Sequence, residues 1–142
     1  MAGQTESFFC SRFPHWVLEA NWHINALELL TLLVALRLWC PRFRGRKIKI
    51  FCDNEASVVV LNSGRCRDGI MLSLLREIAY LCAVNECQVR AVHLAGVDNR
   101  LADKLSRRHM LSNIDLKSLD TELKGWIEKD VEDSLFVCNK VW

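Results

Sequence analysis

One short segment, in which polar and apolar residues alternate and which ends in a carboxylate, constrains the fold more than any other feature of the sequence. Residues 47–52 alternate in this way and are mostly β-prone, which predicts a strand with one buried face. Asp53 then stands at the carboxyl end of that strand. Ligands and chemistry collect at such ends in open α/β sheets, because the strand is rigid and the following loop is exposed. Alternatively, Asp53 only caps a helix that begins near Asn54, since Asp is a favoured N-cap.

The elements around this strand predict an α/β fold. A long apolar helix is expected over residues 25–40, ended by Pro41, and two helices follow the strand at about 55–62 and 68–85. A second strand is expected over residues 87–94 and a short helix over 100–109. The order strand, helix, strand, helix indicates a parallel pair of strands with crossover helices.

Length and composition indicate a soluble, intracellular protein. The 142 residues are 51% hydrophobic and 25% charged, which is ordinary for one globular domain. The most apolar run, residues 27–38, is shorter than the roughly 20 residues of a membrane span and contains charged residues, so we expect a buried helix and no membrane. Seven cysteines without a Cys-x-x-Cys pair or a signal peptide are interpreted as reduced thiols. The spacing of Cys82, Cys87 and His93 fits no common structural zinc site.

The chain divides by charge and pattern into a body, residues 1–109, and a tail, residues 110–142. The tail carries four lysines against seven acidic residues, 4 − 7 = −3, so the body carries +2 − (−3) = +5, which is compatible with a polyanionic partner. Apolar residues recur on one side of residues 114–135, which predicts an amphipathic helix that is weakened at Gly125. Such a helix either packs against the body or binds a partner.

Three acidic residues lie where a carboxylate needs an explanation. Glu28 falls within the apolar helix, Asp53 ends the first strand, and Asp103 lies in the helix after the second strand. A carboxylate among leucines costs free energy unless it is paired or binds a cation. Together the three suggest oxygen ligands for Mg²⁺ or Mn²⁺. The alternatives are an exposed helix start for Glu28, or ion pairs with Arg37, Arg100 or Arg107.

Four segments of the chain resemble the ribonuclease H domain of retrotransposon polyproteins, most closely the DIRS-like, tyrosine-recombinase group. They are residues 23–30, 51–54, 61–67 and 91–107, in the family's order and at similar spacing. The last contains the most specific motif, Asn-x-x-Ala-Asp-x-Leu-Ser-Arg, from Asn99 to Arg107. The resemblance covers about residues 22–108 and leaves out the tail.

This resemblance implies a three-layer fold with a mixed central sheet and an enzyme that cuts the RNA strand of RNA–DNA hybrids. In the family, two divalent metals activate water and stabilise the leaving oxygen. By motif match, Glu28, Asp53 and Asp103 would be the catalytic, metal-binding carboxylates. Recognition of a hybrid depends on shape and the 2′-OH. The side chains placed to read its backbone would be Asn54, Ser63, Arg65, Arg67 and Asn99; for the two arginines the alternative is a solvated basic loop.

The chain departs from the family at its start. The family places a further metal-bridging Asp on its first strand, whereas no Asp precedes Asp53 here. Residues 7–22 resemble the family's third strand and the loop after it, so the first two strands would lie outside this chain, in a longer polyprotein. A histidine that many members carry in the loop at residues 95–98 is also absent; His93 stands at the strand end instead.

Losing one such electrostatic group costs on the order of 3–4 kcal/mol of transition-state stabilisation. We therefore expect a truncated domain with little or no activity of its own, in the cytoplasm or the nucleus. The alternatives are a non-catalytic remnant that binds nucleic acid, and an unrelated interaction module in which the acidic residues only cap helices or form ion pairs.

Overall fold

The computed structural model describes residues 6–95 and 98–138, which form two compact units of mixed helix and strand. The larger unit comprises Phe13–Ala95 and the described part of Glu132–Trp142. The smaller unit comprises the described parts of Met1–Arg12 and Gly96–Val131. The expected tail is therefore divided, with residues 110–131 in the smaller unit and residues 132–138 in the larger one.

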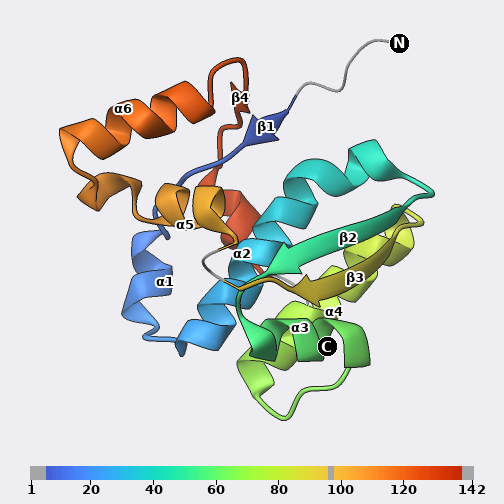
Figure 1. Ribbon diagram of the computed structural model, residues 1–142. Coiled ribbons are helices and arrows are strands. Elements are labelled where there is room, and N and C mark those ends of the chain that lie inside the picture. Colours follow the sequence, from blue (N-terminus) through green and yellow to red (C-terminus); the bar gives the residue numbers. More distant parts are fainter. Residues whose placement is uncertain (1–5, 96–97, 139–142) are drawn as a thin grey trace. The chain divides into compact units, whose positions relative to one another are not determined.

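The larger unit contains the long helices and strands (Figure 1). Its helices are α1 (His15–Glu19), α2 (Ile24–Trp39), α3 (Glu55–Ser63) and α4 (Gly69–Val84), with 3₁₀ turns η1 (Cys40–Phe43) and η3 (Asp133–Phe136). Its strands are β2 (Lys47–Cys52) and β3 (Gln88–His93). The side chains of His23, Asn54 and Asp68 cap the N-termini of α2, α3 and α4 by accepting from backbone N–H groups. The expected helices and strands of this region are confirmed to within a few residues.

The two strands form the parallel pair that the element order predicts. Lys47 pairs with Gln88 and the register runs to Cys52 beside His93, with α3 and α4 in the connection. The outer edge of β3 is covered by a side chain: Asn62 donates to the Ala91 carbonyl (2.8 Å) and accepts from the Ala91 N–H (2.9 Å). Within residues 6–95 and 98–138, no strand pairs with the outer edge of β2.

Apolar packing between α2 and α4 builds the core of the larger unit. Leu29 and Leu33 of α2 are fully buried, and Leu74 of α4 is only 1% exposed. The stretch Ile24–Phe43, α2 with η1, is also long and apolar enough to cross a membrane, a test that core helices of soluble proteins pass as well. The absence of a membrane therefore stays a prediction.

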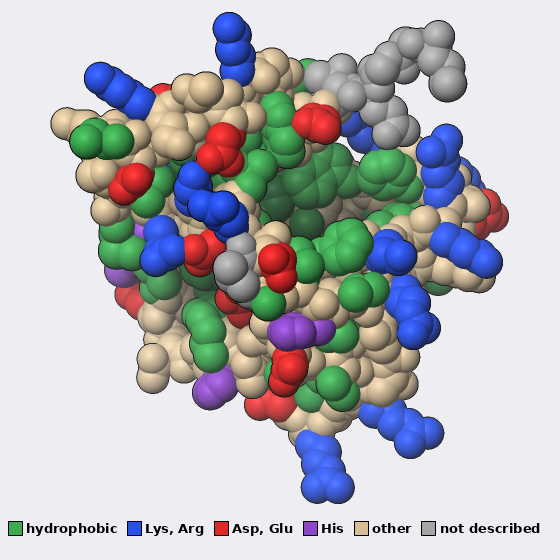
Figure 2. All heavy atoms as spheres, in the orientation of Figure 1, with side chains coloured by type: hydrophobic (Ala, Val, Ile, Leu, Met, Phe, Trp, Pro, Cys, Tyr) green, Lys and Arg blue, Asp and Glu red, His purple; other side chains and the backbone are tan. Residues whose placement is uncertain are grey.

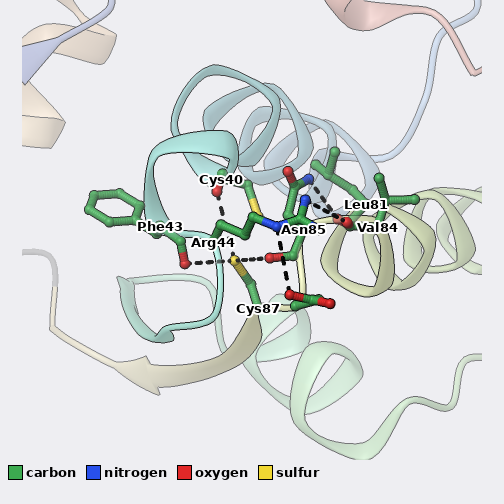
Figure 3. A network of polar contacts seen from close by, with 8 residues as sticks. Cys40, Phe43, Arg44, Leu81, Val84, Asn85 and Cys87 are labelled. Carbon is green, nitrogen blue, oxygen red and sulfur yellow. Dashed lines mark hydrogen bonds and ion pairs between the residues drawn. The ribbon is translucent and has the colours of Figure 1, made fainter.

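A polar network joins the end of α2, the end of α4 and the start of β3 (Figure 3). The Cys87 thiol donates to the carbonyl oxygens of Phe43 (3.0 Å) and Cys40 (3.7 Å), and Asn85 Nδ2 donates to Leu81 O (2.9 Å). Burial, with the neighbouring thiols of Cys87 and Cys82, raises the pKa of Cys40 to about 12. These cysteines are free thiols, and the raised pKa keeps the Cys40 thiol protonated at neutral pH.

The smaller unit has shorter elements and one small core. It contains β1 (Ser7–Phe8), α5 (Arg100–Ser106), η2 (Arg108–Met110), α6 (Asn113–Glu122) and β4 (Ile127–Glu128). Phe8, Leu119 and Leu123 are buried, and four partly buried residues pack against them: Leu101, Leu105, Leu111 and Trp126. The two short strands β1 and β4 pair in parallel.

The expected single helix over residues 114–135 is wrong. α6 ends at Glu122, and the chain turns at Gly125, whose φ of 86° lies in the left-handed region that favours glycine. The apolar periodicity continues past this turn, but Ile127 lies in β4, and Trp126 packs against the same core as Leu119 and Leu123. A helical period alone does not separate a helix from a helix followed by a turn and a strand.

Candidate functional site

The carboxyl end of β2 carries Asp53 on an exposed position directly before α3. Asn54, not Asp53, caps α3: its Oδ1 accepts from the Ser57 N–H at 2.8 Å. Its Nδ2 donates to Asn25 Oδ1 of α2 at 3.0 Å. The capping interpretation of Asp53 is therefore wrong, and its carboxylate is left for another role. Both polar atoms of the Asn54 side chain have structural partners, so its contact with nucleic acid stays a prediction.

Glu28 lies on α2, half-buried, and near Asp53. Burial, and after it the negative charge of Asp53, raises the pKa of Glu28 above its usual value. Among the described residues, no hydrogen bond or ion pair reaches the Glu28 carboxylate. Arg37, the partner considered from the sequence, instead pairs with Glu77 of α4 at 3.3 Å. Glu28 and Asp53 are thus neighbouring carboxylates near the carboxyl end of β2, and carboxylate oxygens are ligands that Mg²⁺ prefers.

A histidine and a further acidic residue flank the same end of the sheet. His93 lies beside Cys52 in the strand register, and its Nδ1 is 4.0 Å from Glu55 Oε1 in the first turn of α3. The position of His93 at the strand end is evident from the sequence, whereas Glu55 and the Asn25–Asn54 hydrogen bond are not. The pairing of Cys52 with His93 could have been inferred from the two alternating strands, since parallel strands bring their carboxyl ends to one edge.

Asp103 lies in the smaller unit, in α5, whereas Glu28 and Asp53 lie in the larger one. Its Oδ2 accepts a hydrogen bond from Arg107 Nη2, one turn later in the chain, which is one of the ion pairs considered from the sequence. Asn99 precedes the same helix as its N-cap residue, without a capping hydrogen bond from its side chain. Gly96 and Val97, between the second strand and α5, lie outside the described residues. Among the residues that the model describes, no group of three or more His, Cys, Asp or Glu side chains is gathered to hold a metal ion.

The loop between α3 and α4 exposes the basic residues of the candidate nucleic-acid interface. Ser63 Oγ accepts from the Arg65 N–H at 3.2 Å, and Gly64 ends α3 in the left-handed conformation. Arg65 and Arg67 are exposed, and within the described part of the chain neither guanidinium has an ion pair. Their charge is free to contact a phosphate, which fits the sequence prediction and equally a solvated basic loop.

Glu28 and Asp53 fit a magnesium or manganese ion in part. Mg²⁺ commonly takes one or two carboxylates and completes its shell with water and substrate phosphates. Two carboxylates in the larger unit meet that minimum, and the third predicted ligand belongs to the other unit. No protein-family model matches the chain, and no curated protein or solved structure shows significant similarity to it.

Proposed function

We propose that the chain is a retroelement-derived, ribonuclease-H-like domain whose complete form cleaves the RNA strand of RNA–DNA hybrids inside the cell. The observation that carries this proposal is the pair of unpartnered carboxylates, Glu28 and Asp53, at the carboxyl end of β2. Asn54 takes the capping role at α3, and Arg37 pairs with Glu77, so neither a helix cap nor that arginine accounts for the two carboxylates. Two neighbouring carboxylates repel each other, which costs free energy. A cation bound between them would offset that cost.

Each residue has a defined part in this proposal. Glu28 and Asp53 hold Mg²⁺ or Mn²⁺, and Asp103 is the last ligand by its motif. The metal supplies Lewis-acid stabilisation of the developing charge when it is bound. Arg65 and Arg67 contact backbone phosphates of the hybrid, together with Ser63, Asn54 and Asn99, and so fix its register without reading its sequence.

The open edge of β2 supports the proposal that part of the sheet comes from elsewhere. A strand edge with unpaired N–H and C=O groups is a site for another strand, and Asn62 closes the opposite edge on β3. In the complete three-layer fold, the family's first strand would join the mixed central sheet. It would bring its metal-bridging Asp beside Asp53. A longer polyprotein supplies that strand, so this chain alone is weak or inactive as a nuclease.

A second candidate function is non-catalytic binding of nucleic acid by a remnant of the same fold. The exposed, unpaired arginines of the loop after α3 favour it, because phosphate contacts need no metal and no further carboxylate. The two functions share their origin and differ in whether the carboxylate pair binds a cation.

The proposal is tested by measuring Mn²⁺ binding and hybrid cleavage on the same samples. We expect Mn²⁺ to raise the melting temperature of the chain, and to lose this effect in Asp53→Asn and Glu28→Gln. Asp120→Asn removes an exposed carboxylate of α6 and should keep the effect. A labelled RNA–DNA hybrid should stay uncut with either metal. Cleavage that is lost in Asp53→Asn would show a complete site, and a melting temperature that Mn²⁺ does not move would remove the metal and leave the binding remnant.

A further inference from the structure

We propose that the exposed face of the β2–β3 pair binds single-stranded nucleic acid, with Phe51 as the surface on which a base stacks. This basic sheet face consists of six residues at three paired positions of the register. They are Lys47 beside Gln88, Lys49 beside Arg90, and Phe51 beside Val92.

Strand geometry places these side chains on one face. Successive side chains of a strand point to opposite faces, and residues paired in the register share a face. The observed burial follows this rule in β2: Lys47, Lys49 and Phe51 are exposed, whereas Ile48 and Ile50 are half-buried. In β3, Gln88 and Arg90 are exposed, and Ala91 on the other face is buried. The helices therefore cover one face and leave the basic sheet face open.

The charge of this face is uniformly positive. Three of its six residues are basic and none is acidic, and among the described residues Lys47, Lys49 and Arg90 form no ion pair. Figure 2 shows Lys and Arg side chains gathered on the side of the larger unit where β2 and β3 begin. Like charges directly opposite each other destabilise a strand pair, so Lys49 beside Arg90 is a cost that a bound polyanion would offset.

Phe51 adds the feature that distinguishes single strands from other polyanions. Its side chain is 54% exposed on a parallel strand, although parallel sheets usually have both faces covered. An exposed aromatic ring next to cationic side chains, as Phe51 is to Lys49 and Arg90, is the combination that single-strand binding proteins use, with bases stacked on rings and phosphates near lysines and arginines. A duplex keeps its bases stacked internally and would leave Phe51 unused. Charge therefore favours a nucleic acid over a protein strand, and the ring favours a single strand over a duplex.

This face is separate in its chemistry from the carboxylate pair. Asp53 and Glu28 need a divalent cation to approach a phosphate, whereas lysine, arginine and phenylalanine do not. Binding to the basic sheet face can thus be measured in EDTA, where the proposed metal site is silent. Failure of the metal proposal would leave this one intact, and the reverse also holds.

The test is fluorescence anisotropy of the full chain with a labelled oligothymidine of about 12 nucleotides, in EDTA and at several salt concentrations. Stacking on one ring is worth enough that Phe51→Ala should weaken binding about 5- to 100-fold. Phe51→Leu, which keeps an apolar group of similar size, should lose nearly as much. Trp16→Ala removes an aromatic residue that is 43% exposed on α1 and should change binding little.

The charge contribution is tested by its salt dependence. Lys47→Gln with Lys49→Gln should weaken binding and lower the slope of log K against log salt by about 1.4, because each lost phosphate contact removes about 0.7 for a single strand. Lys117→Gln with Lys124→Gln removes the same charge from exposed positions of the smaller unit and should leave the slope unchanged.

Three outcomes would overturn the proposal. The first is no binding at low salt by a chain whose circular dichroism shows it folded. The second is a binding pattern that does not depend on this face. Either the control variants lose as much affinity for the oligothymidine as the face variants do, or a duplex binds more tightly and independently of Phe51. The third is self-association, measured by sedimentation, that Phe51→Ala abolishes, since a second protein chain would then be what covers this face.

Discussion

The two units of the chain differ in how they are held together. In the larger unit, α2 and α4 each run for 16 residues and bury leucines against one another. In the smaller unit, the helices run for 7 and 10 residues, the strands for 2 residues each, and the buried core is Phe8, Leu119 and Leu123. Stability scales with buried apolar surface, so the larger unit should hold most of it and the smaller unit should open first.

Among the described residues, the one largely buried ion pair lies in the larger unit, although exposed pairs such as Arg44 with Glu86 lie there too. Arg37 and Glu77 form an ion pair whose side chains are only 18% and 7% exposed, within the larger unit. Ion pairs of the smaller unit are more exposed: Lys104 with Glu122, and Arg108 with Glu128. Exposed pairs contribute about 0–1 kcal/mol each, so they do not compensate for a small core.

This difference matters for the proposed chemistry, because the carboxylates are divided between the units. Glu28 and Asp53 belong to the stable unit, and Asp103 to the weaker one, where Arg107 already holds it. A site that uses all three requires the smaller unit to be folded and Asp103 to be released from its ion pair.

The largest effect is expected for Arg37→Ala. Arg37 Nη1 donates to the carbonyl oxygens of Leu135 (2.6 Å) and Val137 (2.8 Å), and so joins the returning end of the chain to α2. Its loss leaves the Glu77 carboxylate buried without a counter-charge, which should lower the free energy of unfolding by about 3–5 kcal/mol. Urea denaturation measures this. Arg44→Ala, which removes the exposed pair with Glu86, is the control and should cost less than about 1 kcal/mol.

A matched pair of core substitutions tests whether the units unfold separately. Leu33→Ala in α2 and Leu119→Ala in α6 each remove a fully buried leucine, and each should cost about 2–5 kcal/mol within its own unit. Leu119→Ala should raise amide hydrogen exchange in α5 and α6 and leave α2 and α4 protected. Equal loss of protection throughout the chain would show one cooperative unit and would end the comparison.

Sequence patterns succeeded where an element was long and its boundary had a chemical marker. β2 was predicted from its alternation and α2 from a long apolar stretch that Pro41 ends. α4 was predicted from apolar periodicity that begins after Asp68. In the smaller unit they predicted the short helix α5 but failed beyond it, where a helical period spans α6, the turn at Gly125 and β4. Short elements there are set by contacts between distant segments, such as Ser7 with Ile127, and a local pattern does not contain that information.

The candidate site shows the same limit on sequence reasoning. Asp53 could be placed, because a strand end is a local feature. Its proximity to Glu28, and the choice of Asn54 as the cap, depend on how α2 packs beside β2 and α3, so several alternatives remained open. Helix geometry argues against Arg37 as the partner of Glu28, because both lie on α2 and only residues three or four positions apart on a helix face each other. Arg37 contacts Glu77 instead, 40 residues away in the sequence.

The smallest effect, and the one closest to the proposed function, is the pH dependence of Glu28→Gln. Burial and Asp53 raise the pKa of Glu28 above 4.5 in the folded chain, so folding favours its protonated form. The preference of the folded state for protonated Glu28 stabilises the chain below about pH 4. This stabilisation is lost as the pH rises from about 4.5 through the folded-state pKa. Gln mimics the protonated acid, so Glu28→Gln should be the more stable chain near pH 7, by less than about 1 kcal/mol for a half-exposed group, and equal to the unchanged chain at low pH. Thermal unfolding at several pH values in EDTA measures the difference, with Asp120→Asn as the control. A variant that is less stable near pH 7 would reveal a cationic partner for Glu28, and the carboxylate pair would then need no metal to explain it.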